Sequence, residues 1–325
     1  MRYTRMTEVF TPFSPALDRS RPLHEFWWET EQYRVKVQAY SNAPPEFTIQ
    51  KIDFGPDLKR YRAAAERSQN TECSVTNSRK RREAPPPGSP RDPESIERAQ
   101  RRAKSQVRRL VMELAPNHFT TFTTRETGPV YLTPVQWSEM WGYFVALLRR
   151  AGYEFEYVAV LERHPKNPAH LHLHVAWRGS VHYKILRRLW HIAVLHQRGV
   201  KVYKTQYGDD SPGNIQDQPI KAPRGSLRQT RKIAKYIAKY ITKDLISEFN
   251  KKRYWVSRGV NVMAARIFWL SALDQSDAIR EALDMFGHWH HGVGEHGACP
   301  YPVFRPSDRV AWICVDPEKT PPPPF

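Results

Sequence analysis

Hydrophobic and polar residues alternate strictly along residues 169–177, which read Ala-His-Leu-His-Leu-His-Val-Ala-Trp. A period of two predicts a β-strand with one buried face. The two faces then carry Leu171, Leu173 and Val175 on one side and His170, His172 and His174 on the other. Because buried imidazoles cost free energy unless something pairs with them, this face indicates a polar site rather than plain core.

The residues around this strand predict further elements between 116 and 262. Thr133, Pro134 and Gln136 form an N-cap, a first-turn proline and a capping-box partner, so a helix should begin there and run to about Arg150. The other expected elements are strands at 119–124, 153–162 and 201–206, and helices at 181–197, capped by Ser180, and at about 227–249. A polar loop is expected from Gly208 to Gly225. This order predicts an α+β fold, a central antiparallel sheet backed by helices on one face.

The last of these helices has a regular pattern of its own, Arg-Lys-Ile-Ala-Lys-Tyr-Ile-Ala-Lys-Tyr-Ile-Thr-Lys over residues 231–243. At 100° per residue its isoleucines and alanines form one stripe and its lysines form a roughly opposite stripe. Tyr236 and Tyr240 fall between the two stripes, one turn apart. A plain amphipathic helix with amphipathic tyrosines would give the same pattern.

Composition narrows the class of partner. The formal net charge is +18 and the isoelectric point is near 9.9, which indicates an anionic polymer, and nucleic acid above all. No stretch approaches the roughly 20 apolar residues of a membrane span, and the N-terminus lacks a signal-peptide pattern, so we expect a cytoplasmic protein without a membrane partner. Three scattered cysteines imply no disulfide framework.

The sequence divides into four expected parts. Residues 1–67 form an N-terminal segment of unknown role, and residues 68–98 form a basic, proline-rich linker whose composition does not support a core. Residues 99–262 form the working domain. Residues 263–325 form a C-terminal extension with a helix at 276–286, a cluster of histidines from His288 onward and a proline tail; a zinc site in this cluster has no recognisable ligand spacing.

The histidine strand is also a candidate metal site, since neutral imidazole is the commonest protein metal ligand. Side chains on one face of a strand lie about 6.6–6.8 Å apart, so two neighbours can share one ion and three cannot easily do so. The pair is therefore His170 with His172 or His172 with His174. His172 belongs to both options.

A hydrophobic residue between two histidines, followed by Tyr-x-x-Lys on a later helix, resembles the HUH endonucleases. The resemblance covers residues 116 to about 262 and is nearest to rolling-circle replication initiators of single-stranded DNA phages and small plasmids. The strand Phe119–Thr124 resembles the first motif of that family, and residues 253–259 resemble the segment after its tyrosine helix. The distance from Glu162 favours His170 with His172, whereas the Val-Ala-x-x-Gly that follows favours His172 with His174.

The resemblance implies a mechanism. Two histidines with Glu162 would hold Mn²⁺ or Mg²⁺ against the scissile phosphate of single-stranded origin DNA, and Tyr236 or Tyr240 would attack it. This leaves a 5′-phosphotyrosine and a 3′-hydroxyl primer, and a later attack rejoins the strand. Tyr236 ranks first because more helix follows it to place Lys239. The expected DNA-binding residues are Arg231, Lys232, Lys235, Lys243 and Arg258.

Other interpretations of the same residues remain open. Both tyrosines can act in turn, or one can serve only to pack. The chain can also be a transposase or relaxase-like strand transferase of the same superfamily, or a basic single-strand-binding protein without catalysis, whose tyrosines would stack on bases. For the initiator we expect action in a bacterial host cell, where a host helicase or polymerase is a possible partner.

Overall fold

A computed structural model describes eleven segments of the chain. The described residues are 32–52, 93–125, 131–164, 166–200, 211–218, 220–243, 254–270, 272, 274–291, 302–306 and 310–315. The chain forms two compact units. The first contains residues 1–39, 44–90 and 264–316, and the second contains residues 40–43, 91–263 and 317–325.

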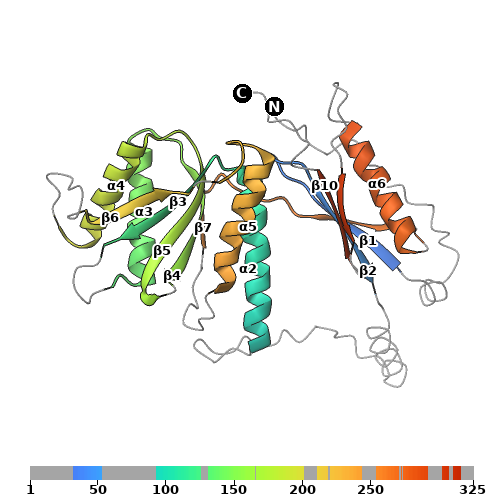
Figure 1. The fold of residues 1–325 in the computed structure, drawn as a ribbon, viewed down its shortest axis with the longest axis horizontal. Helices are drawn as coiled ribbons and strands as arrows, with labels where there is room; N and C mark the ends of the chain where they lie inside the picture. Colours follow the sequence, from blue (N-terminus) through green and yellow to red (C-terminus); the bar gives the residue numbers. More distant parts are fainter. Residues whose placement is uncertain are drawn as a thin grey trace, which may run out of the picture. The chain divides into compact units, whose positions relative to one another are not determined.

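The second unit is built on a five-stranded sheet (Figure 1). Its strands are β3 (His118–Thr124), β4 (Glu156–His164), β5 (Asn167–Arg178), β6 (Gly213–Asp217) and β7 (Tyr254–Val256). They lie in the order β6-β3-β5-β4-β7, and each neighbouring pair is antiparallel. The histidine strand β5 is therefore the central strand, and β4 and β5 form the hairpin that the short link between them predicts.

Helices cover both faces of this sheet, so the expectation of helices on one face is wrong. The first pair, α3 (Pro134–Arg150) and α4 (Tyr183–Gln197), packs on the face that carries Leu173. The second pair, α2 (Pro93–Leu114) and α5 (Leu227–Lys243), packs together on the opposite face. A buried apolar stripe on α2 explains the difference; it contains Val107, Leu110, Val111 and Leu114.

The starts of the two helices on the first face follow from local sequence. Thr133 Oγ1 accepts from Gln136 N at 3.3 Å and Gln136 Oε1 accepts from Thr133 N at 2.9 Å, which confirms the predicted capping box of α3. Helix α4 begins later than expected. Its N-cap is His182, whose Nδ1 accepts from Lys184 N, and not Ser180.

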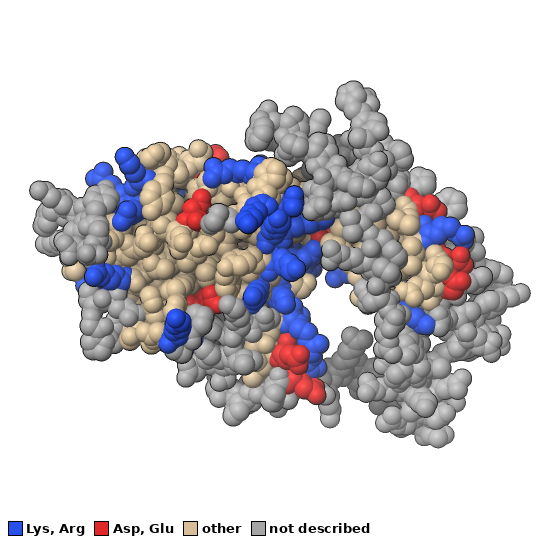
Figure 2. Space-filling model, in the orientation of Figure 1, with Lys and Arg blue, Asp and Glu red and all other residues tan. Residues whose placement is uncertain are grey.

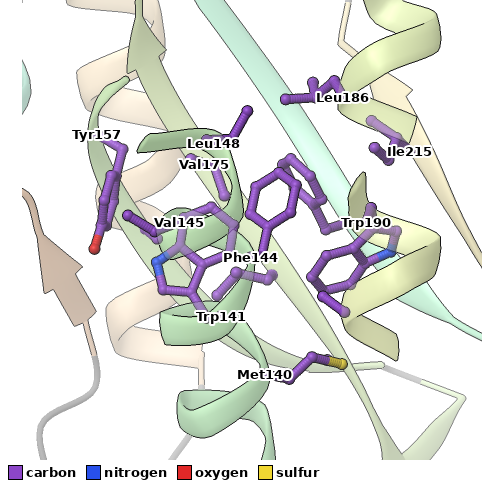
Figure 3. Close-up of a cluster of buried hydrophobic side chains, with 14 of the residues drawn as sticks. Met140, Trp141, Phe144, Val145, Leu148, Tyr157, Val175, Leu186, Trp190 and Ile215 are labelled. Carbon is purple, nitrogen blue, oxygen red and sulfur yellow. The ribbon is translucent and has the colours of Figure 1, made fainter. Parts of the chain in front are cut away.

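Large aromatic side chains fill the space between the sheet and these two helices (Figure 3). Phe122 of β3 contacts the rings of Trp141, Phe144 and Trp190 at centroid distances of 5.1–5.5 Å. All four side chains are fully buried. Edge-to-face contacts of this kind fix side-chain orientation as well as burying area, so this core holds β3 and β5 in a defined register.

The strand β6 was not expected. It lies inside the segment that the sequence suggests is a polar loop, and it pairs with β3 at the edge of the sheet. Only Ile215 of its five residues is apolar and buried, so the strand has almost no alternating signal. The strand expected at 201–206 and the helix end expected at 249 lie outside the described residues, whereas α2 begins at Pro93, within the expected linker.

The first unit is a second antiparallel sheet with one helix. Its strands are β1 (Gln32–Gln38), β2 (Glu46–Ile52), β8 (Arg266–Leu270), β9 (Pro302–Pro306) and β10 (Val310–Val315), in the order β8-β1-β2-β10-β9. Helix α6 (Gln275–His291) packs on it through Phe286, whose ring contacts Phe47 at 5.2 Å. The expected helix at 276–286 is thus confirmed, while two ends of the chain expected to be poorly defined share one sheet.

Both units combine antiparallel sheets with helices, which confirms the α+β class. No helix in the described segments is long and apolar enough to cross a bilayer.

Candidate active site

The polar face of β5 brings a carboxylate and two imidazoles together. Glu162 of β4 is directly opposite His172 of β5 in the strand register. Its Oε2 lies 2.7 Å from Nε2 of His174, two residues further along the same face, and both side chains are buried. These three residues were all named from the sequence, and the alternation that separates them from Leu171 and Leu173 holds as predicted.

His174 is held from its other side by residues that the sequence did not single out. Its Nδ1 lies 3.0 Å from Oγ1 of Thr121 on β3, and Gln218 Nε2 donates to the same hydroxyl at 3.3 Å. An ionised carboxylate can only accept, so His174 donates through Nε2 to Glu162 and accepts at Nδ1 from Thr121. Thr121 lies in the threonine-rich strand that resembles the first family motif, and that motif was the signal that could have found it.

His170 points toward a different neighbourhood. Its Nε2 lies 3.1 Å from the carbonyl oxygen of Thr124, and its ring is 4.8 Å from that of His172 and 6.0 Å from that of His164. Burial lowers the pKa of His172 to about 4, and the positive charges that His170 and His164 would carry lower it further. His172 is therefore neutral at physiological pH, the state in which an imidazole can bind a metal.

Two nitrogens and one carboxylate oxygen suit a borderline divalent ion such as Mn²⁺ in chemistry. Glu162 and His174 already have their donor atoms in contact, and His172 lies on the same face, opposite Glu162. Within the described segments, no group of three or more His, Cys, Asp or Glu side chains is arranged to hold an ion. His172 would therefore have to turn toward the other two to complete the set.

Helix α5 places both tyrosines over this face. The ring of Tyr240 stacks on that of His174, with centroids 4.0 Å apart and planes 7° from parallel. The ring of Tyr236 meets that of Tyr240 edge-on at 5.2 Å and contacts Phe119 at 5.3 Å. The histidine strand and the tyrosine helix, about 60 residues apart in sequence, are thus in direct contact.

The two tyrosines differ in their surroundings. Tyr236 is 42% exposed, whereas Tyr240 is 6% exposed. Burial raises the pKa of Tyr240 above its ordinary value, and its hydrogen bond with Tyr236 and the nearby Glu162 carboxylate raise the pKa further. A phenol is activated by losing its proton, so Tyr240 is the harder of the two to activate.

Basic side chains surround the tyrosines on the outer side of α5. Lys235 and Lys239 are exposed, Arg231 is half-buried, and Lys232 donates to the carbonyl oxygen of Lys221 at 2.7 Å. Arg258 is exposed in the turn after β7, and the side chain of Lys243 lies outside the described residues, as do those of the C-terminal histidines. Figure 2 shows Lys and Arg atoms gathered in a band over α5 and α2.

Comparison with known proteins identifies one family. Residues 117–245 match the sequence model of a family described as replication-associated protein ORF2. The matched segment runs from β3 to just beyond α5 and contains both the histidine strand and the tyrosine helix. Neither the curated proteins nor the solved structures that were compared give a match. The match supports a replication-associated protein of the initiator type.

Proposed function

We propose that this protein initiates rolling-circle replication by nicking single-stranded origin DNA through Tyr236. The nick leaves a 5′-phosphotyrosine and a 3′-hydroxyl primer, and a later transfer rejoins the strand. One observation carries the proposal: the tyrosines of α5 contact His174 on the polar face of β5, within the segment that matches a replication-associated family. A tyrosine beside a carboxylate and imidazoles, bordered by exposed lysines, is an arrangement suited to phosphoryl transfer.

The difference in exposure selects the nucleophile. Tyr236 lies at the surface, where a DNA phosphate can approach its hydroxyl, and Lys235 and Lys239 are exposed on the same helix. Tyr240 is buried against His174 and holds its proton more firmly. We assign the first attack to Tyr236 and give Tyr240 the role of positioning the His174 ring by stacking.

The transfer step can be written with atoms in balance. The Tyr236 oxygen forms a bond to the scissile phosphorus, and the bond from that phosphorus to the 3′ oxygen of the preceding nucleotide breaks. The phenolic proton passes to solvent, which reaches this half-exposed side chain. The departing oxygen takes up a proton and becomes the 3′-hydroxyl. The reverse attack by a 3′-hydroxyl on the phosphotyrosine restores the tyrosine and joins the strand.

Glu162, His172 and His174 would hold the divalent ion, Mn²⁺ or Mg²⁺. When bound there, such an ion neutralises the negative charge that gathers on the phosphoryl oxygens during the attack. The protein's own contribution is to keep His172 neutral and to fix His174 between Thr121 and Glu162. His170, turned toward the Thr124 carbonyl, is assigned no ligand role.

The basic band supplies non-specific affinity for the DNA backbone. Lys235 and Lys239 on α5, with Arg98 and Arg102 on α2, are exposed on two helices that pack together. Each phosphate that they neutralise releases counterions, so binding should weaken steeply with salt. The proposed partner is therefore single-stranded origin DNA; a host helicase or polymerase remains a further proposal from the resemblance alone.

The test is covalent capture of DNA. The full chain is incubated with single-stranded DNA from its replicon and Mn²⁺, and the products are separated on a denaturing gel. We expect a protein–DNA adduct from the wild type, none from Tyr236→Phe, and an adduct from Tyr240→Phe, which keeps the ring that stacks on His174. Mass spectrometry of the adduct identifies the modified tyrosine.

Matched variants separate catalysis from binding. His172→Ala and Glu162→Gln should lose the adduct and still bind DNA, whereas Arg258→Gln should lose affinity and keep cleavage at saturating DNA. Tight binding with no cleavage by the wild type in any divalent metal would overturn the enzyme and favour the non-catalytic binder. An adduct on Tyr240 alone would overturn the assignment of the nucleophile.

A further inference from the structure

The sheet of the first unit has two chemically different faces. Helix α6 covers the face that carries Val35, Phe47 and Ile49, which are buried, and its Phe286 meets Phe47 in an edge-to-face contact. The residues between these positions along β1, β2 and β8 point to the opposite face. That opposite face, which carries Arg34, Lys36, Ile267 and Trp269, is called the Trp269 face below.

The Trp269 face exposes large apolar side chains where an accessible sheet face normally carries polar ones. Trp269 and Ile267, two residues apart on the edge strand β8, are each 52% exposed. Arg34 is directly opposite Trp269 in the register of β1 with β8, and Lys36 is directly opposite Ile267. Each exposed apolar side chain is therefore paired across the strands with a cationic one.

The charge of these strands is one-sided. The five strands contain the basic residues Arg34, Lys36, Lys51, Arg266 and Arg305 and a single acidic residue, Glu46, which is buried opposite Gln38. The acidic side chains of α6, such as Asp277 and Asp284, belong to the helix on the other face. A ligand on the Trp269 face therefore meets cations and an indole ring and no exposed carboxylate from these strands.

The arrangement of the side chains indicates the ligand. An exposed indole offers a flat surface on which a base can stack, and this stacking tolerates any base. Arg34 is held in place, because its Nε donates to Gln50 Oε1 at 2.9 Å, and its remaining guanidinium donors suit a phosphate. Trp312 of β10, opposite Thr48, extends the aromatic surface further across the sheet.

We propose that the Trp269 face is a second binding site for single-stranded DNA, separate from the segment that carries the tyrosines. Bases stack on Trp269, and Arg34 and Lys36 bind the adjoining phosphates. The choice of DNA over RNA rests on the proposed function, while the binding of a single strand rests on this face alone. The chain then holds its substrate at two places, one that cuts and one that only retains the strand.

The test measures binding and cutting separately. Binding of the full chain to a labelled oligothymidine of about 16 nucleotides is followed by fluorescence anisotropy. We expect Trp269→Ala to weaken binding by about 5- to 150-fold and Trp269→Phe to restore most of it. Val200→Ala, which truncates an exposed apolar side chain in the other unit, is the matched control and should bind like the wild type.

Salt dependence tests the cations. Arg34→Gln combined with Lys36→Gln should reduce the slope of log affinity against log salt by about 1.4, the value for two phosphate contacts with a single strand. Arg280→Gln, on α6 and paired with Asp277, is the control in the same unit and should leave the slope unchanged.

Cross-linking gives a direct outcome. An oligonucleotide that contains iodouracil should cross-link under light to the peptide that contains Trp269. Binding by Trp269→Ala that equals the wild type, or cross-links confined to residues 117–245, would overturn the proposal and leave a protein partner as the alternative occupant. These readouts do not depend on cleavage: if the wild type binds through Trp269 but never nicks DNA, the proposed function fails and this site stands.

Discussion

Replacing Thr121 by valine removes one hydroxyl and leaves the side chain nearly unchanged in size. In the folded protein that hydroxyl accepts from Gln218 Nε2 and donates to His174 Nδ1, and His174 Nε2 donates to Glu162. Thr121, His174 and Glu162 are buried, so water does not readily replace the lost partner. The substitution therefore leaves His174 Nδ1 without its donor in the interior.

The expected cost follows from this burial. Removing one partner of a buried hydrogen bond lowers the free energy of unfolding by about 1–3 kcal/mol, because the group left behind stays desolvated. The second unit contains residues 91–263 in one continuous stretch, and a domain of this size loses about 2–4 °C of melting temperature per kcal/mol. Thr121→Val should therefore melt about 2–12 °C below the wild type.

The same substitution should also weaken metal binding. If His174 Nε2 binds the ion, its proton must move to Nδ1, and Thr121 Oγ1 then becomes the acceptor that orients the ring. Loss of such a partner typically costs about 10- to 100-fold in metal affinity. Electron paramagnetic resonance of free Mn²⁺ during a titration measures this affinity without any cleavage reaction.

Thr123→Val is the control, because Thr123 lies on the same face of the same strand but its hydroxyl donates to the backbone oxygen of Asn214. It should change the melting temperature little and leave the Mn²⁺ affinity unchanged. A Thr121→Val protein that melts with the wild type and binds Mn²⁺ equally well would refute this account of His174.

Other substitutions test the core, the edge strand, the titration and the basic helix. Phe122→Ala should lower the free energy of unfolding by about 3–5 kcal/mol in chemical denaturation, because the ring is fully buried among aromatic side chains. Gly213→Ala would place a Cβ against a backbone oxygen of β3, so amide hydrogen exchange on β6 should become faster. The imidazole of His172 should titrate near pH 4 by NMR; because its pKa is lowered from 6.5 on folding, its contribution to stability is complete above pH 6.5, falls between 6.5 and 4, and is constant below that. Lys235→Gln with Lys239→Gln should reduce the salt slope of single-strand binding by about 1.4, whereas an unchanged slope would mean that DNA does not follow α5.

Period and amphipathicity made one part of the site readable from sequence. Strict alternation assigned His172 and His174 to one face of β5, and a 3.6-residue stripe assigned Ile233 and Ile237 to the buried side of α5, as the structure has them. Both patterns are local, so neither depends on what the chain does elsewhere. The resemblance then joined the strand to the helix, which local pattern alone does not do.

Contacts between distant segments were out of reach. Thr121 meets Gln218 across 97 residues, and the sheet of the first unit pairs β1 with β8, which lies far along the chain. The edge strand β6 has one buried apolar residue, Ile215, and an edge strand needs little more. Such pairings depend on which strands find each other in three dimensions, and no periodicity along the chain encodes that choice.

The two tyrosines show how small a displacement separates equivalent residues. Tyr236 and Tyr240 each begin a Tyr-x-x-Lys segment, so the sequence around them is nearly the same. Four residues advance a helix by about 6 Å and rotate it by about 40°. Because α5 lies against β4 and β5, this displacement carries Tyr240 over the ring of His174 and leaves Tyr236 at the surface. The sheet beneath the helix, and not the tyrosine motif, therefore decides which hydroxyl a DNA phosphate can reach.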